Sequence, residues 1–114
     1  MLLAIIIPHY NESWDICRPF FDIINAQKGV DFNDFRITII HDGFDIDQFP
    51  IQETYGKGKL YSIVNQINIP HAGVSVCRNY GLQLATADWV CFCDCDDCYA
   101  SVFSLMMIFH VLKS

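Results

Sequence analysis

The sequence predicts an α/β fold, a three-layer sandwich in which helices cover both faces of a mainly parallel sheet. Two observations support this prediction. Short apolar segments rich in β-branched residues alternate along the chain with segments of helical spacing. The apolar segments are continuous rather than alternating, which is typical of strands buried on both faces. No repeat, linker or low-complexity tract divides the 114 residues, so we expect one domain over 1–114.

The amino-terminal part predicts one strand and one helix. Residues 2–7 form an apolar run that is closed by Pro8, as expected for a buried strand. Pro19 is awkward inside a helix, so we expect the regular helix to begin near Arg18, and Gly29 to end it. The residues that this helix is expected to turn inward are Ile16, Phe20, Ile23, Ile24 and Gln27.

The middle of the chain predicts two further strands. Residues 35–40 form the second strand, which ends in residues 41–43, His-Asp-Gly, where the glycine permits a sharp turn. Residues 44–60 predict a loop with at most one helical turn. The third strand is expected within residues 61–69, and Pro70 ends it.

The carboxyl-terminal part predicts a helix over 73–85, a fourth strand over 89–93 and a last helix over about 100–113. The inward positions expected on the first of these helices are Val74, Cys77, Leu84 and Ala85. The last helix is apolar nearly all round. We therefore expect a second copy of the chain, as in a homo-oligomer, or another partner to cover it; the alternative is an aggregation-prone patch.

Composition excludes several classes of protein. The net charge is −6 and lysine and arginine do not cluster, which argues against a nucleic-acid partner. Residues 1–7 lack the basic start and the length of a signal peptide, and the apolar run 102–112 is too short to span a bilayer. The six cysteines do not form repeated Cys-x2-Cys pairs, so we expect reduced thiols in a cytoplasmic protein.

Three aspartates follow the fourth strand directly, at positions 94, 96 and 97. Aspartate is a poor strand former, and an unpaired charge is costly to bury. These carboxylates are therefore expected to emerge at the edge of the sheet and to meet a cation. Oxygen ligands favour Mg²⁺ or Mn²⁺. The alternative is that the aspartates cap the next helix.

Polar groups end three of the predicted strands: residues 8–12, Asp42 and residues 94–97. In parallel sheets ligands bind outside the carboxyl ends of the strands, so we expect these groups to share one site. The glycine-rich loops of dinucleotide-binding and P-loop proteins are absent from the sequence. What remains is a nucleotide site in which Tyr10 stacks on a base, Asp42 accepts hydrogen bonds from base or ribose, and Arg78 contacts a phosphate. The alternatives are a turn aspartate, a surface tyrosine and a helix arginine without such roles.

Four segments carry a resemblance to a known family: residues 5–12 (Ile-Ile-Ile-Pro-His-Tyr-Asn-Glu), 41–43 (His-Asp-Gly), 73–81 (Gly-Val-Ser-Val-Cys-Arg-Asn-Tyr-Gly) and 92–97 (Phe-Cys-Asp-Cys-Asp-Asp). In this order and spacing, they resemble the amino-terminal, nucleotide-sugar-binding half of the family 2 glycosyltransferases, which have the Rossmann-like GT-A fold. The family usually shows Asp-Asp-Gly-Ser at the second strand end. Here His41 and Phe44 replace the first and last of these residues, and Asp42 keeps the base-binding carboxylate.

The resemblance implies a donor that is a nucleoside diphosphate sugar, with a UDP-sugar expected, and Mn²⁺ or Mg²⁺ as cofactor. The metal ligands that it implies are Asp94 and Asp96 of an Asp-x-Asp motif, with Asp96 as the direct ligand and Asp94 nearer the ribose. The reaction that it implies is inverting sugar transfer to an acceptor hydroxyl, as in polysaccharide biosynthesis. The implied nucleotide-binding residues are Pro8, Tyr10, Glu12, Asp42, Arg78 and Asp94.

Members of that family carry their general base beyond the acidic turn. We therefore expect the 114 residues to bind a donor, and to be truncated at the carboxyl-terminal end relative to the family; the acceptor is not predicted. One alternative is a non-catalytic binding domain that kept the scaffold. Another is a nucleotidyltransferase, although the glycine-rich loop with a basic residue that such enzymes place after the first strand is not present in residues 8–12.

Overall fold

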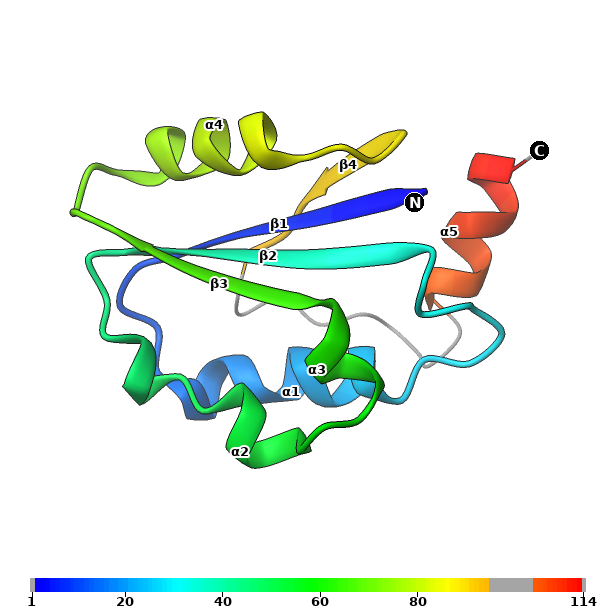
Figure 1. The fold of residues 1–114 in the computed structure, drawn as a ribbon, viewed down its shortest axis with the longest axis horizontal. Coiled ribbons are helices and arrows are strands. Elements are labelled where there is room, and N and C mark those ends of the chain that lie inside the picture. The colour runs from blue at the N-terminus through cyan, green and yellow to red at the C-terminus, as the bar shows by residue number, and fades with distance from the viewer. Residues whose placement is uncertain (1, 95–103, 114) are drawn as a thin grey trace.

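The computed structural model describes residues 2–94 and 104–113, with the side chains of 104–107 left out (Figure 1). The elements are, in order, β1 (Leu3–His9), α1 (Trp14–Asn25), β2 (Phe35–Asp42), the 3₁₀ helix η1 (Ile46–Gln48), α2 (Ile51–Tyr55), α3 (Lys59–Ile63), β3 (Val64–Ile69), α4 (Val74–Leu84), β4 (Trp89–Phe92) and α5 (Ser104–Lys113).

The sheet has the strand order β3-β2-β1-β4, and every pair is parallel. Helices α1, α2 and α3 lie on one face, and α4 lies on the other (Figure 1). The predicted α/β fold is confirmed. The chain runs outward from β1 to β2 and β3, and α4 then returns it to place β4 on the other side of β1. This reversal of strand order at β1 is where open α/β sheets bind ligands.

The central strand β1 is longer than predicted. All seven of its residues are buried, and it continues through Pro8 to His9, which is in register with His41. The ladder with β4 extends along β1 only to Ile6, whose carbonyl accepts the N–H of Cys93. Successive residues of a strand form hydrogen bonds to opposite neighbours, so Pro8, two residues after Ile6, faces the β4 side as well. Its missing N–H therefore lies beyond the last described bond between β1 and β4. The proline therefore does not interrupt the pairing with β2.

Helix α1 begins earlier than predicted, at Trp14. The side chain of Ser13 caps it by accepting the N–H of Ile16 at 3.4 Å, so the helix starts before Pro19 and includes it at the cost of one backbone hydrogen bond. Ile16 is 56% exposed, contrary to the expected inward face. The helix ends at Asn25, well before Gly29. Its buried residues are Cys17, Phe20, Phe21 and Ile24.

Helix α4 packs on β1 and β2 through a face that differs in part from the predicted one. The expected burial of Cys77 is confirmed, but the other buried residue is Gly81, and Val74 and Leu84 are exposed. A β-carbon added at Gly81 would lie 2.5 Å from Cγ2 of Ile6 on β1. The glycine therefore lets α4 lie directly on the strand, and this close approach replaces the expected contacts of the larger side chains.

Residues 44–63 are more helical than predicted. They form η1, α2 and α3, and apolar side chains of α2 and α3 join the main core. The third strand, expected within 61–69, begins at Val64 because α3 runs to Ile63. At the other end of the sheet, Phe109 of α5 is buried and its ring lies 6.0 Å from that of Phe35. Part of the last helix thus packs on the chain's own core, and its contact with a second copy stays a prediction. Among the described residues, no helix has the length and apolar character needed to cross a membrane.

Candidate nucleotide site

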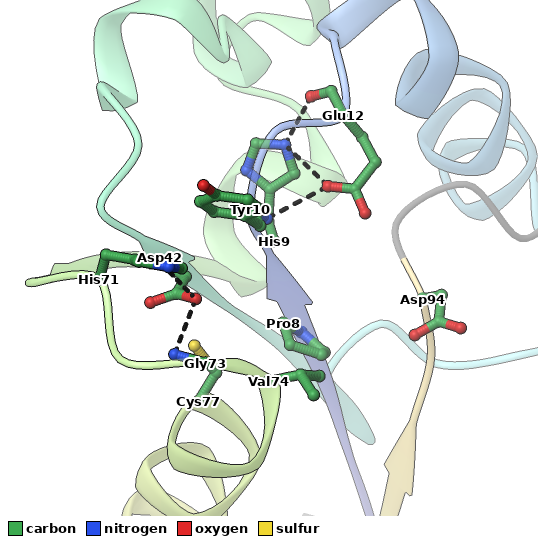
Figure 2. Close-up of a pocket in the computed structure, with 10 residues that line it drawn as sticks. All are labelled: Pro8, His9, Tyr10, Glu12, Asp42, His71, Gly73, Val74, Cys77 and Asp94. Atoms are coloured by element: carbon green, nitrogen blue, oxygen red, sulfur yellow. Dashed lines mark hydrogen bonds and ion pairs between the residues drawn. The ribbon is translucent and has the colours of Figure 1, made fainter.

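A pocket of about 210 Å³ lies at the carboxyl ends of the strands, beside the start of α4 (Figure 2). It is formed where the ends of β1 and β2 meet the residue that follows β4, as the sequence predicts. The residues that line it are Pro8, His9, Tyr10, Glu12, Asp42, His71, Gly73, Val74, Cys77 and Asp94.

Asp42 is the most tightly held polar residue of this pocket. It is 3% exposed, and its Oδ1 accepts the backbone N–H of Ala72 at 2.6 Å. Its Oδ2 accepts the N–H of Gly73 at 3.1 Å and Nδ1–H of His71 at 3.0 Å. Burial alone works to raise the pKa of Asp42, but these donors and the nearby His71 ring outweigh it and hold that pKa below its usual value. Asp42 is therefore ionised and fixes the start of α4.

Cys77 lines the same pocket as Asp42. Burial raises the pKa of the Cys77 thiol, and the negative charge of the Asp42 carboxylate adds to this shift. Cys77 is fully buried, so its thiol stays protonated.

Two aromatic rings meet at the mouth of the pocket. The rings of Tyr10 and His71 are stacked, with centroids 4.5 Å apart and planes inclined by 20°. Tyr10 is 50% exposed, and its backbone N–H donates to Oε2 of Glu12 at 3.1 Å. Glu12 thus shapes the loop that presents the Tyr10 ring, and Figure 2 shows that ring above Asp42.

A buried histidine pair joins the ends of β1 and β2 behind this pocket. Nε2 of His9 lies 2.6 Å from the carbonyl oxygen of Glu12, so this nitrogen donates. Nε2 of His41 lies 2.7 Å from Oε1 of Gln66 and donates to it, because an amide oxygen accepts. The neutral His41 ring therefore accepts at Nδ1, and Nδ1–H of His9 donates to it at 2.8 Å.

The two histidines differ in their pKa values. Burial lowers the pKa of His41 to about 4, and the neighbouring His9 adds to this shift, so the ring is neutral at pH 7. Burial also works to lower the pKa of His9, but hydrogen bonds with Cys17 and the Glu12 carbonyl, and the nearby Glu12 carboxylate, raise it overall. The pair fixes the spacing between the β1 loop and Asp42.

The β4 side of the pocket carries an ion pair. Nη2 of Arg78 lies 3.9 Å from Oδ1 of Asp94, and the two side chains are 44% and 59% exposed. Asp96 and Asp97 lie outside the described residues. Within the described part of the chain, no three histidine, cysteine, aspartate or glutamate side chains form a metal-binding group.

The pocket brings together five of the residues expected to bind nucleotide: Pro8, Tyr10, Glu12, Asp42 and Asp94. Arg78 does not line it but reaches its rim through Asp94. Five further residues line the pocket that were not predicted as site residues: His9, His71, Gly73, Val74 and Cys77. One signal was available, because Pro70-His-Ala-Gly73 follows the third strand at the same sheet edge as Asp42.

Comparison with known proteins places these features in a family. A sequence model described as "Glycosyl transferase family 2" matches residues 4–110. The uncharacterized glycosyltransferase YibD of Escherichia coli (strain K12) is 32% identical over 106 residues, which are 92% of this chain and 29% of YibD. The amylovoran biosynthesis glycosyltransferase AmsB of Erwinia amylovora is 31% identical over 98 residues, 82% of this chain and 30% of AmsB. The chain spans less than a third of these curated relatives.

Solved structures share the fold. S. aureus TarS 1-349 in complex with UDP-GlcNAc matches with a TM-score of 0.82 and 23% identity, over 99% of this chain and 31% of that one. The mannosyltransferase PcManGT from Pyrobaculum calidifontis, in complex with GDP-Man and Mn²⁺, matches with a TM-score of 0.71 and 20% identity, over 88% and 29% of the two chains. The family match covers nearly the whole sequence and includes every described residue of the pocket. The chain belongs to glycosyl transferase family 2.

Proposed function

We propose that residues 1–114 are the donor-binding domain of a glycosyltransferase and bind a nucleoside diphosphate sugar, a UDP-sugar in the first instance. One observation carries the proposal: a stacking ring, a buried carboxylate and an exposed carboxylate, those of Tyr10, Asp42 and Asp94, converge on one pocket at the carboxyl edge of the sheet. The TarS complexes with UDP and UDP-GlcNAc support this choice of donor.

The base is assigned to the part of the pocket between Pro8, Tyr10 and Asp42. A tyrosine ring stacks on any base, and a buried carboxylate accepts the imide N–H of a uracil. A cavity of about 210 Å³ is smaller than the roughly 300–1,000 Å³ of typical complete ligand sites. It therefore suits the nucleoside, and the diphosphate and sugar extend outward past Asp94.

The diphosphate and a divalent metal ion are assigned to the β4 side. Asp94 is the exposed carboxylate at this rim, while Asp42 is held by N–H donors and Glu12 holds the Tyr10 loop. A Mg²⁺ or Mn²⁺ site built from one or two carboxylates plus phosphate oxygens fits this arrangement, with Asp96 as the second carboxylate. A metal ion bound there would offset negative charge on the departing diphosphate. Arg78 contributes positive charge beside it. The complex of PcManGT with GDP-Man and Mn²⁺ supports the metal.

The reaction that we assign is inverting transfer of the sugar to an acceptor hydroxyl during polysaccharide biosynthesis, a role suggested by the name of AmsB. The described residues serve donor binding in this proposal. We assign deprotonation of the acceptor to none of them.

Calorimetric titration of the chain with UDP, with and without MnCl₂, tests the proposal. We expect binding that strengthens with Mn²⁺, weakens in Tyr10→Ala and loses its metal dependence in Asp96→Ala. Asp88→Ala is the matched control, because Asp88 is an exposed aspartate just before β4, at the opposite end of that strand from Asp94. This variant should bind UDP like the unchanged chain. The absence of UDP binding under all these conditions would favour a non-catalytic interaction domain instead.

A further inference from the structure

The carboxylate of Asp42 is already covered by donors. The backbone N–H of Ala72 bonds to its Oδ1, and the N–H of Gly73 and the ring Nδ1–H of His71 both bond to its Oδ2. Each carboxylate oxygen offers about two lone-pair positions, so Oδ2 is fully occupied, and Asp42 is only 3% exposed. A nucleotide base that donates its imide N–H to this carboxylate must therefore take the place of one of the groups that cover it.

Two of these donors are held in place by the fold, because the N–H groups of Ala72 and Gly73 belong to the backbone that leads into α4. The side chain of His71 differs, because 59% of its surface is exposed. His71 is thus the donor that a ligand can displace without unfolding the start of α4.

His71 also stacks on the ring that we assign to the base. Its imidazole lies 4.5 Å from the Tyr10 ring at an angle of 20°. A planar, nitrogen-containing ring therefore already makes both contacts expected of a uracil: it stacks on Tyr10 and donates to Asp42. We propose that His71 occupies the base position when no nucleotide is bound, and that the base binds by displacing it. This inference rests on the proposed function.

The displacement is confined to a side chain. A β-carbon added at Gly43 would lie 3.1 Å from Cβ and 3.2 Å from the backbone nitrogen of His71, so the two backbones are in close contact. The N–H of Gly43 also bonds to the carbonyl of Ile69 at 2.8 Å. The backbone at His71 is held by these contacts, and the ring leaves by rotation about its own torsions. His71 then lowers the apparent nucleotide affinity, because the base can bind only in the fraction of molecules in which the His71 ring has left Asp42.

UDP titrations of the chain and of His71→Ala test this inference. We expect the variant to bind UDP about five-fold more tightly, because a closed state that competes with the ligand is removed. His110→Ala, which removes an exposed histidine from α5 at the other end of the sheet, is the matched control and should leave the affinity unchanged. His71→Asn retains an N–H donor without the ring, so it should give a smaller gain and serves as a second variant if His71→Ala does not fold.

A second ligand separates displacement from other effects. UDP with a methyl group on the imide nitrogen cannot donate to Asp42, so its affinity should gain less from His71→Ala than that of UDP. NMR of the histidine rings should show the His71 signals moving on titration with UDP while those of His110 stay. Weaker UDP binding by His71→Ala would mean that the base is held between Tyr10 and His71, and would overturn the inference. If neither the chain nor His71→Ala binds UDP, the proposed function itself is wrong and the inference fails with it; if both bind equally, only the inference fails.

Discussion

The two sides of the pocket are built differently. On the β2 side, Asp42 is buried under three N–H donors and lies beside the buried His9–His41 pair. On the β4 side, Arg78 and Asp94 are exposed and joined by an ion pair of 3.9 Å. Polar groups that are buried must be satisfied within the chain, whereas exposed groups remain available to solvent or ligand. The β2 side is therefore part of the folded framework, and the β4 side is suited to receive a charged ligand.

Replacement of Asp42 should cause the largest loss of stability and so test this difference between the two sides most directly. Asp42→Ala removes a buried acceptor and leaves the backbone N–H groups of Ala72 and Gly73 without a partner. We expect the free energy of unfolding to fall by about 3–4 kcal/mol, as measured by urea denaturation. Asp88→Ala, in an exposed turn, should change it by less than about 0.5 kcal/mol. Equal effects of the two substitutions would show that Asp42 does not hold the start of α4.

The buried histidine pair predicts a dependence of stability on pH. The folded chain keeps His41 neutral down to about pH 4, whereas in the unfolded chain its pKa returns to about 6.5. Between these values the unfolded chain binds the extra proton, so the free energy of unfolding falls as the pH is lowered. His41 alone contributes about 3 kcal/mol to this fall. The raised pKa of His9 acts in the opposite direction, because its contribution is present at low pH and lost as the pH rises. We therefore expect a net fall that is smaller than the about 3 kcal/mol from His41 alone.

Urea denaturation at pH 7.5 and pH 4.5 measures this difference. His41→Asn should remove most of it, since an asparagine does not titrate, while His110→Asn should retain it because His110 is exposed. A chain that is equally stable at both pH values would show that the two histidines compensate fully. The prediction of a net slope would then be wrong.

The general form of the sheet could be predicted because it depends on local pattern. The apolar runs of β1 and β2, and the carboxylates that follow the strands, are visible in the sequence alone, and the structure brings Tyr10, Asp42 and Asp94 to one pocket. The start of α1 was predicted too late because Pro19 was given more weight than the Ser13 cap. The inward face of α4 was predicted from large apolar residues, but a contact of Gly81 with Ile6 on a distant strand decides it.

The role of His71 could not be read from the sequence for a related reason. A histidine in a loop carries no sign of what it stacks on, and its partners Tyr10 and Asp42 lie 61 and 29 positions away along the chain. The same holds for His9 and His41, which become a pair only because β1 and β2 are in parallel register. Residues whose role depends on register and packing need the folded structure, whereas strand ends do not.

Replacement of Asp94 should give the smallest change in stability and thereby sharpen the comparison with Asp42. An exposed ion pair contributes little to folding, so we expect Asp94→Ala to change the free energy of unfolding by less than about 0.5 kcal/mol. If the β4 side receives the metal and diphosphate, the same variant should lose most of the strengthening of UDP binding by Mn²⁺. Urea denaturation and calorimetry on one sample measure both quantities. A large loss of stability would show that Asp94, like Asp42, supports the fold. Unchanged Mn²⁺ dependence would show that other carboxylates bind the metal. A stable variant without Mn²⁺ dependence would show that the β2 side of the pocket supports folding and the β4 side binds the ligand.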